Sequence, residues 1–186
     1  MKVIALQQKY QKEVIPKMKE KFSYKNNLAV PKLEKIIVNA GVGRLSQQQN
    51  FEEKILPELM KELALITGQK PKTTAAKKSI SGFKIRQGQI VGLKTTLRRK
   101  RMYDFLERLI YIYLPRVRDF KGIDIKNIDA KGNLTIGIKE QTIMPEINPE
   151  TSKVDFGLEV TIVSNAGKRE EVIELYRQLG IPLKKQ

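Results

Sequence analysis

The sequence predicts an α+β fold in which helices pack on one face of a mostly antiparallel sheet and leave a basic face open. Two short segments, 133–139 and 156–163, alternate apolar with polar residues, as strands with one buried and one solvated face do. Segment 3–22 instead repeats apolar residues at spacings of three and four, which is typical of an amphipathic helix. Together these patterns favour helices packed against a sheet.

Helices and strands are predicted along the whole chain from these two periodicities. Gly68 and Gly180 follow the second and fourth helices, where a glycine commonly ends a helix. Pro16 is expected to kink or split the first helix, Pro57 conflicts with the second, and Pro115 is expected to end the third. The predicted helices are 3–22, 47–67, 102–114 and 168–179, and the predicted strands are 33–43, 69–76, 89–101, 133–139 and 156–163.

The third predicted helix, 102–114, is apolar almost all round and is therefore expected to be central. Its Tyr111 and Tyr113 are expected to pack in the core rather than to stack on bases. The chain has 186 residues, which is enough for one packed domain. We expect residues 1–186 to form a single domain with an exposed basic loop at 77–88.

The positive charge is concentrated in one part of the chain. The sequence has 36 Lys and Arg residues against 20 Asp and Glu, for a net charge of +16. Segment 63–103 alone carries 11 basic residues and no acidic one. A concentration of one sign repels itself unless a polyanion neutralises it, whereas a charge that serves solubility is spread with both signs mixed. The sequence therefore predicts a nucleic acid or an anionic membrane as partner.

Several classes of function are excluded by composition. The chain has no Cys and no His, which rules out thiol nucleophiles, histidine acid–base catalysis, Cys or His zinc sites and disulfides. It has no apolar run long enough to span a membrane, and its first residues do not resemble an export signal, so we expect a cytoplasmic protein without a cofactor. A membrane surface is disfavoured because the charge falls on a strand and a loop, not on an amphipathic helix.

Strand alternation assigns side chains to the open face. In 93–101, Lys94, Thr96, Arg98 and Lys100 point away from Leu93, Thr95 and Leu97, and in 35–39 the outward set is Lys35, Ile37 and Asn39. The open face is thus expected to mix cations with hydroxyls and an amide. Surfaces of this kind bind RNA, because cations take phosphates and neutral polar groups meet 2′-hydroxyls and base edges.

One motif raises an enzymatic alternative. Gly41 and Gly43 form a G-x-G turn after a strand, as in dinucleotide-binding folds. Ser46 stands at the third glycine position, and no hydrophobic strand with a terminal acid follows about 20 residues later. The simpler interpretation is that the glycines permit a tight turn.

Motifs along nearly the whole chain carry a family resemblance. They include V-P-K-L-E-K-I-I-V-N-A-G-V-G at 30–43, K-K-S-I-S-G-F-K-I-R-Q-G at 77–88 and P-R-V-R-D-F-K-G at 115–122, with shorter runs at 67–71, 93–98, 102–110, 137–141 and 145–147. In order and spacing they closely resemble the bacterial ribosomal protein family that binds 5S ribosomal RNA, the fifth in the large-subunit count. The tail after about residue 165 is less distinctive.

The resemblance implies which residues bind RNA. In that family an Asn, a Gln and a Thr organise the 5S rRNA contact, and the matching positions are Asn39, Gln69 and Thr96. Phosphate partners near them are expected to be Lys35, Lys94 and Arg98. The loop that faces tRNA matches 77–88, with Lys77, Lys78, Ser79, Gly82, Phe83, Lys84 and Arg86. The Lys-rich first helix departs from the family without altering these motifs.

The resemblance also implies partners: 5S rRNA, 23S rRNA and neighbouring large-subunit proteins in the central protuberance, P-site tRNA, and a small-subunit head protein across an intersubunit bridge. The implied role is structural and non-enzymatic. Two alternatives stay open from the residues alone, a nucleotide-dependent enzyme that uses Gly41 and Gly43 and a protein that binds duplex DNA.

Overall fold

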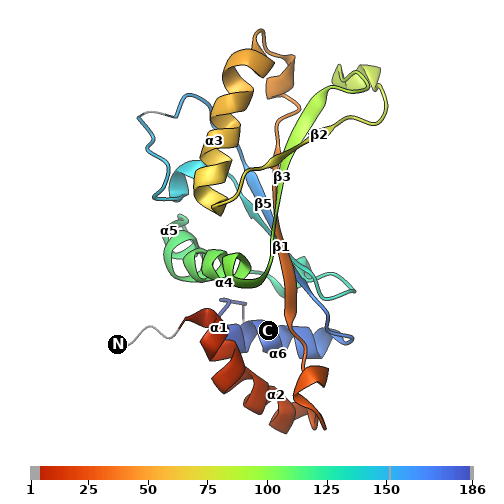
Figure 1. The fold of residues 1–186 in the computed structure, drawn as a ribbon, viewed down its shortest axis with the longest axis vertical. Coiled ribbons are helices and arrows are strands. Elements are labelled where there is room, and N and C mark those ends of the chain that lie inside the picture. Colours follow the sequence, from red (N-terminus) through yellow and green to blue (C-terminus); the bar gives the residue numbers. More distant parts are fainter. Residues whose placement is uncertain (1–4, 151, 185–186) are drawn as a thin grey trace. The chain divides into compact units, whose positions relative to one another are not determined.

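The computed structural model describes residues 5–150 and 152–184. Val3 and Ile4 of the first predicted helix lie outside the described residues. Helices and strands alternate irregularly along the chain (Figure 1). The α-helices are α1 (Leu6–Lys9), α2 (Ile15–Phe22), α3 (Leu56–Thr67), α4 (Arg99–Arg108), α5 (Leu114–Arg116) and α6 (Arg169–Leu179), and the strands are β1 (Leu33–Gly41), β2 (Lys72–Ala75), β3 (Ile90–Leu97), β4 (Leu134–Ile138) and β5 (Leu158–Ser164).

The five strands form one sheet in the order β2-β3-β1-β5-β4. Strands β2 and β3 are antiparallel neighbours, with Lys72 opposite Lys94 and Thr74 opposite Gly92, and the register shifts once, between Thr74 and Ala75. Burial alternates along β1, β4 and β5, so each of these strands turns one row of side chains into the core. The α+β class and the mostly antiparallel sheet predicted from the sequence are confirmed.

The chain divides into two compact units, each built from segments that are distant in sequence. The first contains the described residues of Met1–Ile36, Arg98–Ile136 and Thr161–Gln186, and the second contains Ile37–Leu97 and Gly137–Val160. Strands β1, β4 and β5 contribute residues to both units. That residues 1–186 form a single domain stays a prediction.

The core of the first unit is formed by helices packed on one another. Helix α1 packs on α4, and α2 packs on α6. Tyr113 and Tyr176 are fully buried there, and the Tyr176 hydroxyl donates to the main-chain oxygens of Gly132 (2.8 Å) and Ile162 (3.2 Å). Because a buried hydroxyl needs a partner, these bonds make so large a polar side chain compatible with the core.

The core of the second unit lies between α3 and the sheet. The buried side chains of α3 are Leu56, Leu59, Leu63, Ile66 and Thr67, and this helix packs on β3, whose Leu93, Thr95 and Leu97 are buried. Gly68 ends α3 in the left-handed conformation, at φ 68°, and its N–H donates to Ala64 O at 2.8 Å. The glycine cap predicted at this position is confirmed, as is the one at Gly180, at φ 94°.

Pro16, Pro57 and Pro115 each follow a π-helical turn. The turns are Tyr10–Val14, Phe51–Ile55 and Leu109–Tyr113, and each ends two residues before Pro16, Pro57 or Pro115. Proline has no N–H, and its ring clashes with the carbonyl four residues earlier in a regular helix. A wider turn is one way to relieve that clash, and the helices continue beyond Pro16 and Pro57, to Phe22 and Thr67. The third helix ends at Arg116, one residue after Pro115, which agrees with the expected end to within one residue.

Two expectations need correction. The strand predicted over 89–101 ends at Leu97, and α4 begins at Arg99, so Lys100 lies in a helix and Arg98 at its N-terminal cap. Tyr113 is fully buried as expected, but Tyr111 is 55% exposed. The apolar run of 102–114 therefore did not show which of the two tyrosines faces solvent.

Candidate nucleic-acid interface

Three strands of the second unit present polar side chains on the face opposite the core. On β3, Lys94 is exposed and Thr96 is half-buried, while the alternate residues are buried. On β1, Asn39 is half-buried between the buried residues Val38 and Ala40. The alternation that the sequence predicted for 93–97 and 35–39 is what the structure shows.

The neighbouring strand β2 extends this polar row, and the sequence analysis missed it. Lys72 is paired with Lys94 across the antiparallel ladder, and Thr74 is paired with Gly92. Directly opposite lysines repel each other, which costs stability unless an anion lies over both. Lys72 and Thr74 are two residues apart in the sequence, which places both on one face of a strand. That Lys72 lies beside Lys94 is shown only by the register in which β2 and β3 pair.

Gly92 leaves room for the polar groups around it. A Cβ at this position would stand 2.7 Å from Thr74 Oγ1, 3.4 Å from Ala40 O and 3.9 Å from Asn39 Oδ1. The missing side chain therefore lets Thr74 from β2 and Asn39 from β1 approach each other over β3. This grouping needs a residue without a Cβ, and nothing in the sequence pattern marked Gly92 as part of it.

Gln69 reaches the same strand from the connection after α3. Its Nε2 donates to Thr96 O at 3.3 Å, and its own main-chain oxygen accepts from Thr67 Oγ1 at 3.0 Å. The left-handed Gly68 turns the chain sharply enough for this contact. The structure thus brings Gln69 against the main chain of Thr96 and leaves the Thr96 hydroxyl out of that bond.

The other two predicted phosphate partners belong to the first unit. Lys35 is half-buried on β1, on the same side of the strand as Asn39, and Arg98 is exposed just before α4. Neither is part of the polar cluster of the second unit, which we define as Asn39, Gln69, Lys72, Thr74, Lys94 and Thr96. We call this set the sheet cluster.

The basic loop 77–88 is the tip of the β2–β3 hairpin. Ile80 and Ile85 exchange main-chain hydrogen bonds of 2.9 and 3.2 Å, and Lys84 takes the left-handed conformation at φ 53°. Ser79 Oγ accepts from the Gln87 N–H at 2.9 Å. The predicted contact residues on the loop are all exposed: Lys77, Lys78, Ser79, Gly82, Phe83, Lys84 and Arg86.

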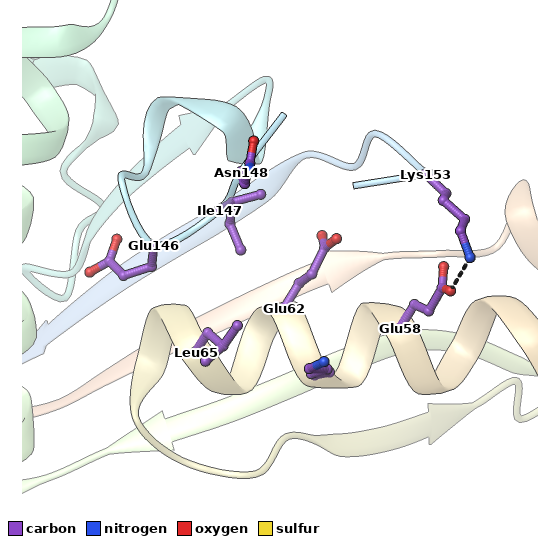
Figure 2. Close-up of a pocket in the computed structure, with 8 residues that line it drawn as sticks. Glu58, Glu62, Leu65, Glu146, Ile147, Asn148 and Lys153 are labelled. Atoms are coloured by element: carbon purple, nitrogen blue, oxygen red, sulfur yellow. Dashed lines mark hydrogen bonds and ion pairs between the residues drawn. The ribbon is translucent and has the colours of Figure 1, made fainter. Parts of the chain in front are cut away.

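An acidic cavity of about 250 Å³ lies elsewhere in the second unit. Figure 2 shows Glu58 and Glu62 rising from α3 toward the segment that carries Ile147 and Lys153. Lys153 pairs with Glu58 at 2.7 Å, and burial raises the pKa of Glu62, with Glu58 and Asp155 adding to the effect. Because carboxylates repel phosphates, this cavity does not suit RNA.

The dinucleotide-site alternative does not fit the structure around Gly41 and Gly43. In a dinucleotide fold the glycine turn opens directly into a helix, whose N-terminus holds the pyrophosphate. Here β1 ends at Gly41, a short 3₁₀ turn covers Leu45–Gln47, and the helical segment starts only at Phe51. The glycines therefore form a turn, as the simpler interpretation has it.

Within residues 5–150 and 152–184, no helix is both long and apolar enough to cross a bilayer.

Comparisons with known proteins identify the family to which the chain belongs. The profile of the family described as "Ribosomal protein L5" matches residues 26–86, and the profile of the C-terminal part of the same ribosomal family matches 90–183. The chain is similar to proteins named "Large ribosomal subunit protein uL5". It is 49% identical over 180 residues to that of Lacticaseibacillus casei (97% of this chain, 98% of the relative) and 50% identical over 179 residues to that of Clostridium botulinum strain Eklund 17B (95% and 97%). The chain therefore belongs to the ribosomal protein L5 family, a family of structural ribosomal proteins that are not enzymes.

Proposed function

We propose that this protein is a structural constituent of the large ribosomal subunit in the bacterial cytoplasm and that it holds 5S rRNA in the central protuberance through the sheet cluster. The observation that carries the proposal is the pair Lys72 and Lys94, which stand opposite each other on adjacent strands beside the neutral polar groups of Asn39, Thr74 and Thr96. Phosphates neutralise such a pair, and amides and hydroxyls suit 2′-hydroxyls.

Charge and neutral groups have different roles in this surface. Lysines attract phosphates over a distance and release counterions on binding, so six phosphate contacts would give a slope of log K against log salt of about −4 to −5. Asn39 and Thr96 release no counterion. They act only at contact, where a truncation leaves partners unpaired at about 1–3 kcal/mol each.

A salt titration of 5S rRNA affinity separates the two roles. We expect Lys94→Ala to make the slope shallower by about one unit and Thr96→Ala to weaken binding equally at low and high salt. Lys126→Ala is the matched control, because it removes one positive charge, as Lys94→Ala does. Lys126 is exposed and belongs to the first unit, apart from the sheet cluster. A parent affinity that does not change with salt, or a Lys126→Ala effect equal to that of Lys94→Ala, would contradict the proposal.

The wider partner set rests on the family resemblance. We infer that loop 77–88 contacts P-site tRNA, that 23S rRNA and neighbouring large-subunit proteins surround the chain, and that a small-subunit head protein meets it across the subunit interface. Exposed Phe83 and the loop cations support the tRNA contact, since an aromatic ring with flanking cations suits RNA. Deleting 79–86 should leave 5S rRNA binding nearly intact and weaken tRNA binding to reconstituted ribosomes. Loss of 5S rRNA binding in that variant would assign the loop a different partner.

Duplex DNA is the remaining alternative. Identification of the nucleic acid that co-purifies with the protein decides it directly, and competition between 5S rRNA and duplex DNA at fixed salt provides a second measurement. Preference for the duplex would overturn the proposal.

A further inference from the structure

A short segment of the second unit, 152–155, is attached to α3 by few contacts. We call this segment the strap. None of its residues is buried, whereas Ile147 before it and Phe156 directly after it are buried. The hydrophobic effect therefore fixes the ends of the surrounding loop and contributes little to holding the strap itself in place.

Polar contacts hold the strap closed. Lys153 Nζ lies 2.7 Å from Glu58 Oε1 on α3, but both side chains are largely in solvent, and ion pairs of that kind contribute little. The buried side chain of Gln141 donates from Nε2 to Val154 O at 2.9 Å and to Ser152 Oγ at 3.2 Å. Because these contacts are few, a change of one charge beside the strap can shift its balance between closed and open.

The strap borders the acidic cavity of about 250 Å³, into which Glu62 projects from α3 (Figure 2). Glu62 Oε2 is buried and has no hydrogen-bond partner within the described part of the chain. Burial raises the pKa of Glu62, and the neighbouring carboxylates raise it further, against a smaller opposing effect of Ser152. The charged groups that face Glu62 are Glu58 and Lys61 on its own helix and Glu146, Lys153 and Asp155 on the opposite side.

The charge of Glu62 therefore opposes closure. When Glu62 is ionised, four carboxylates share this region with two ammonium groups, and one of these, on Lys153, is already paired with Glu58. When the strap lifts, water reaches Glu62 and its pKa returns toward the ordinary value of about 4.3. The closed form thus binds the Glu62 proton more tightly than the open form does. Closure is favoured at low pH and weakens as the pH rises from about 4 through the raised pKa.

We propose that the strap is a proton-controlled closure, which stays shut beside the cavity while Glu62 is neutral and opens more often once Glu62 is ionised. The opening is local: Ile147 and Phe156 keep the loop anchored on either side, and α3 and the sheet remain folded. The inference goes beyond the proposed function, because it concerns the free protein and involves no residue of the sheet cluster or of loop 77–88.

Amide hydrogen exchange of the free protein provides the test, because protection of an amide tracks the equilibrium for opening. Two N–H groups report on the strap: that of Ser152, which donates to Asn148 O at 3.1 Å, and that of Phe156, which donates to Gln141 Oε1 at 2.9 Å. Exchange is measured at about pH 5 and about pH 8 and corrected for the intrinsic effect of pH. We expect protection of both amides to fall roughly threefold to tenfold between the two, since a shift of one pKa unit corresponds to a tenfold change. Protection in β3 should stay constant.

Three variants assign the effect to Glu62. Glu62→Gln should keep the strap protected at both pH values. Glu53→Gln is the matched control and should behave like the parent, because it makes the same chemical change at an exposed residue outside the cavity. Lys153→Met removes an ammonium group that offsets the carboxylates, so protection should fall at a higher pH than in the parent. This last variant keeps the proposal testable even if Glu62→Gln does not fold.

Other outcomes decide against the proposal. Equal protection of the strap at both pH values in the parent would overturn it, and so would the same pH dependence in Glu62→Gln as in the parent. A fall of equal size in β3 would show that the second unit opens as a whole and that the strap is no separate device. The experiment contains no RNA, so failure of the parent to bind 5S rRNA would contradict the proposed function without bearing on the strap.

Discussion

Two adjacent threonines of β3 should respond in opposite ways to substitution. Thr95 is 1% exposed, and its hydroxyl has no hydrogen-bond partner among the residues that the structure describes. Thr96 is half-buried on the outer face beside Gln69. We therefore expect Thr95→Val to stabilise the protein without changing RNA affinity, and Thr96→Ala to weaken RNA binding with little change in stability.

The size of the first effect follows from the burial of the hydroxyl. An unpaired buried polar group costs about 1–3 kcal/mol, and valine keeps the branched shape of threonine while removing that group. A gain of about 1–2 kcal/mol in the free energy of unfolding is expected. For a chain of this length, each kcal/mol raises the melting temperature by about 2–4 °C. Thr95→Val should thus melt about 2–8 °C above the parent.

Calorimetric melts of the free protein and salt titrations of 5S rRNA affinity measure both sides of this prediction. A melting temperature of Thr95→Val several degrees below the parent would show that the Thr95 hydroxyl is satisfied, for example by water. A loss of RNA affinity in Thr95→Val, or a large loss of stability in Thr96→Ala, would refute the assignment of the two faces of β3.

Three further predictions concern stability. Glu62→Gln should raise the melting temperature at about pH 8 and leave it nearly unchanged at about pH 4. Burial raises the pKa of Glu62 in the folded protein, so the carboxylate charge is costly only above that pKa. An equal change in melting temperature at both pH values would contradict this. Gln141→Ala should lower the free energy of unfolding by about 1–3 kcal/mol in urea titrations, because it leaves the buried Phe156 N–H and the part-buried Val154 O without the Gln141 side chain. A loss below about 0.5 kcal/mol would show that water replaces the side chain. Gly180→Ala should lower the melting temperature, because φ there is 94°, and an unchanged melt would mean that the chain ends α6 in another way.

Much of this protein could be predicted from local patterns. Period-two alternation put Lys94, Thr96 and Asn39 on the outer face, because successive side chains of a strand point to opposite sides whatever the strand pairs with. Gly68 and Gly180 marked the ends of helices for an equally local reason, the ease with which glycine takes a left-handed conformation. The acid-free segment 63–103 and the family motifs indicated RNA without any tertiary information.

Only the tertiary structure decided which of these residues meet. Three contacts show this: the pairing of Lys72 with Lys94, the approach of Asn39 and Thr74 at Gly92, and the hydrogen bond from Gln69 to Thr96. They join residues up to 53 positions apart, and each depends on how the strands align. Tyr111 and Tyr113 look alike in an apolar run, but the π-helical turn and the packing of the helix expose one and bury the other. Hydrogen bonds from Gln47 to Phe83 O and from Gln89 to Ser46 O likewise join the turn after β1 to the β2–β3 hairpin, and no local pattern showed them. Local periodicity sets the direction of a side chain from its own backbone, whereas contacts between segments depend on packing that no local pattern encodes.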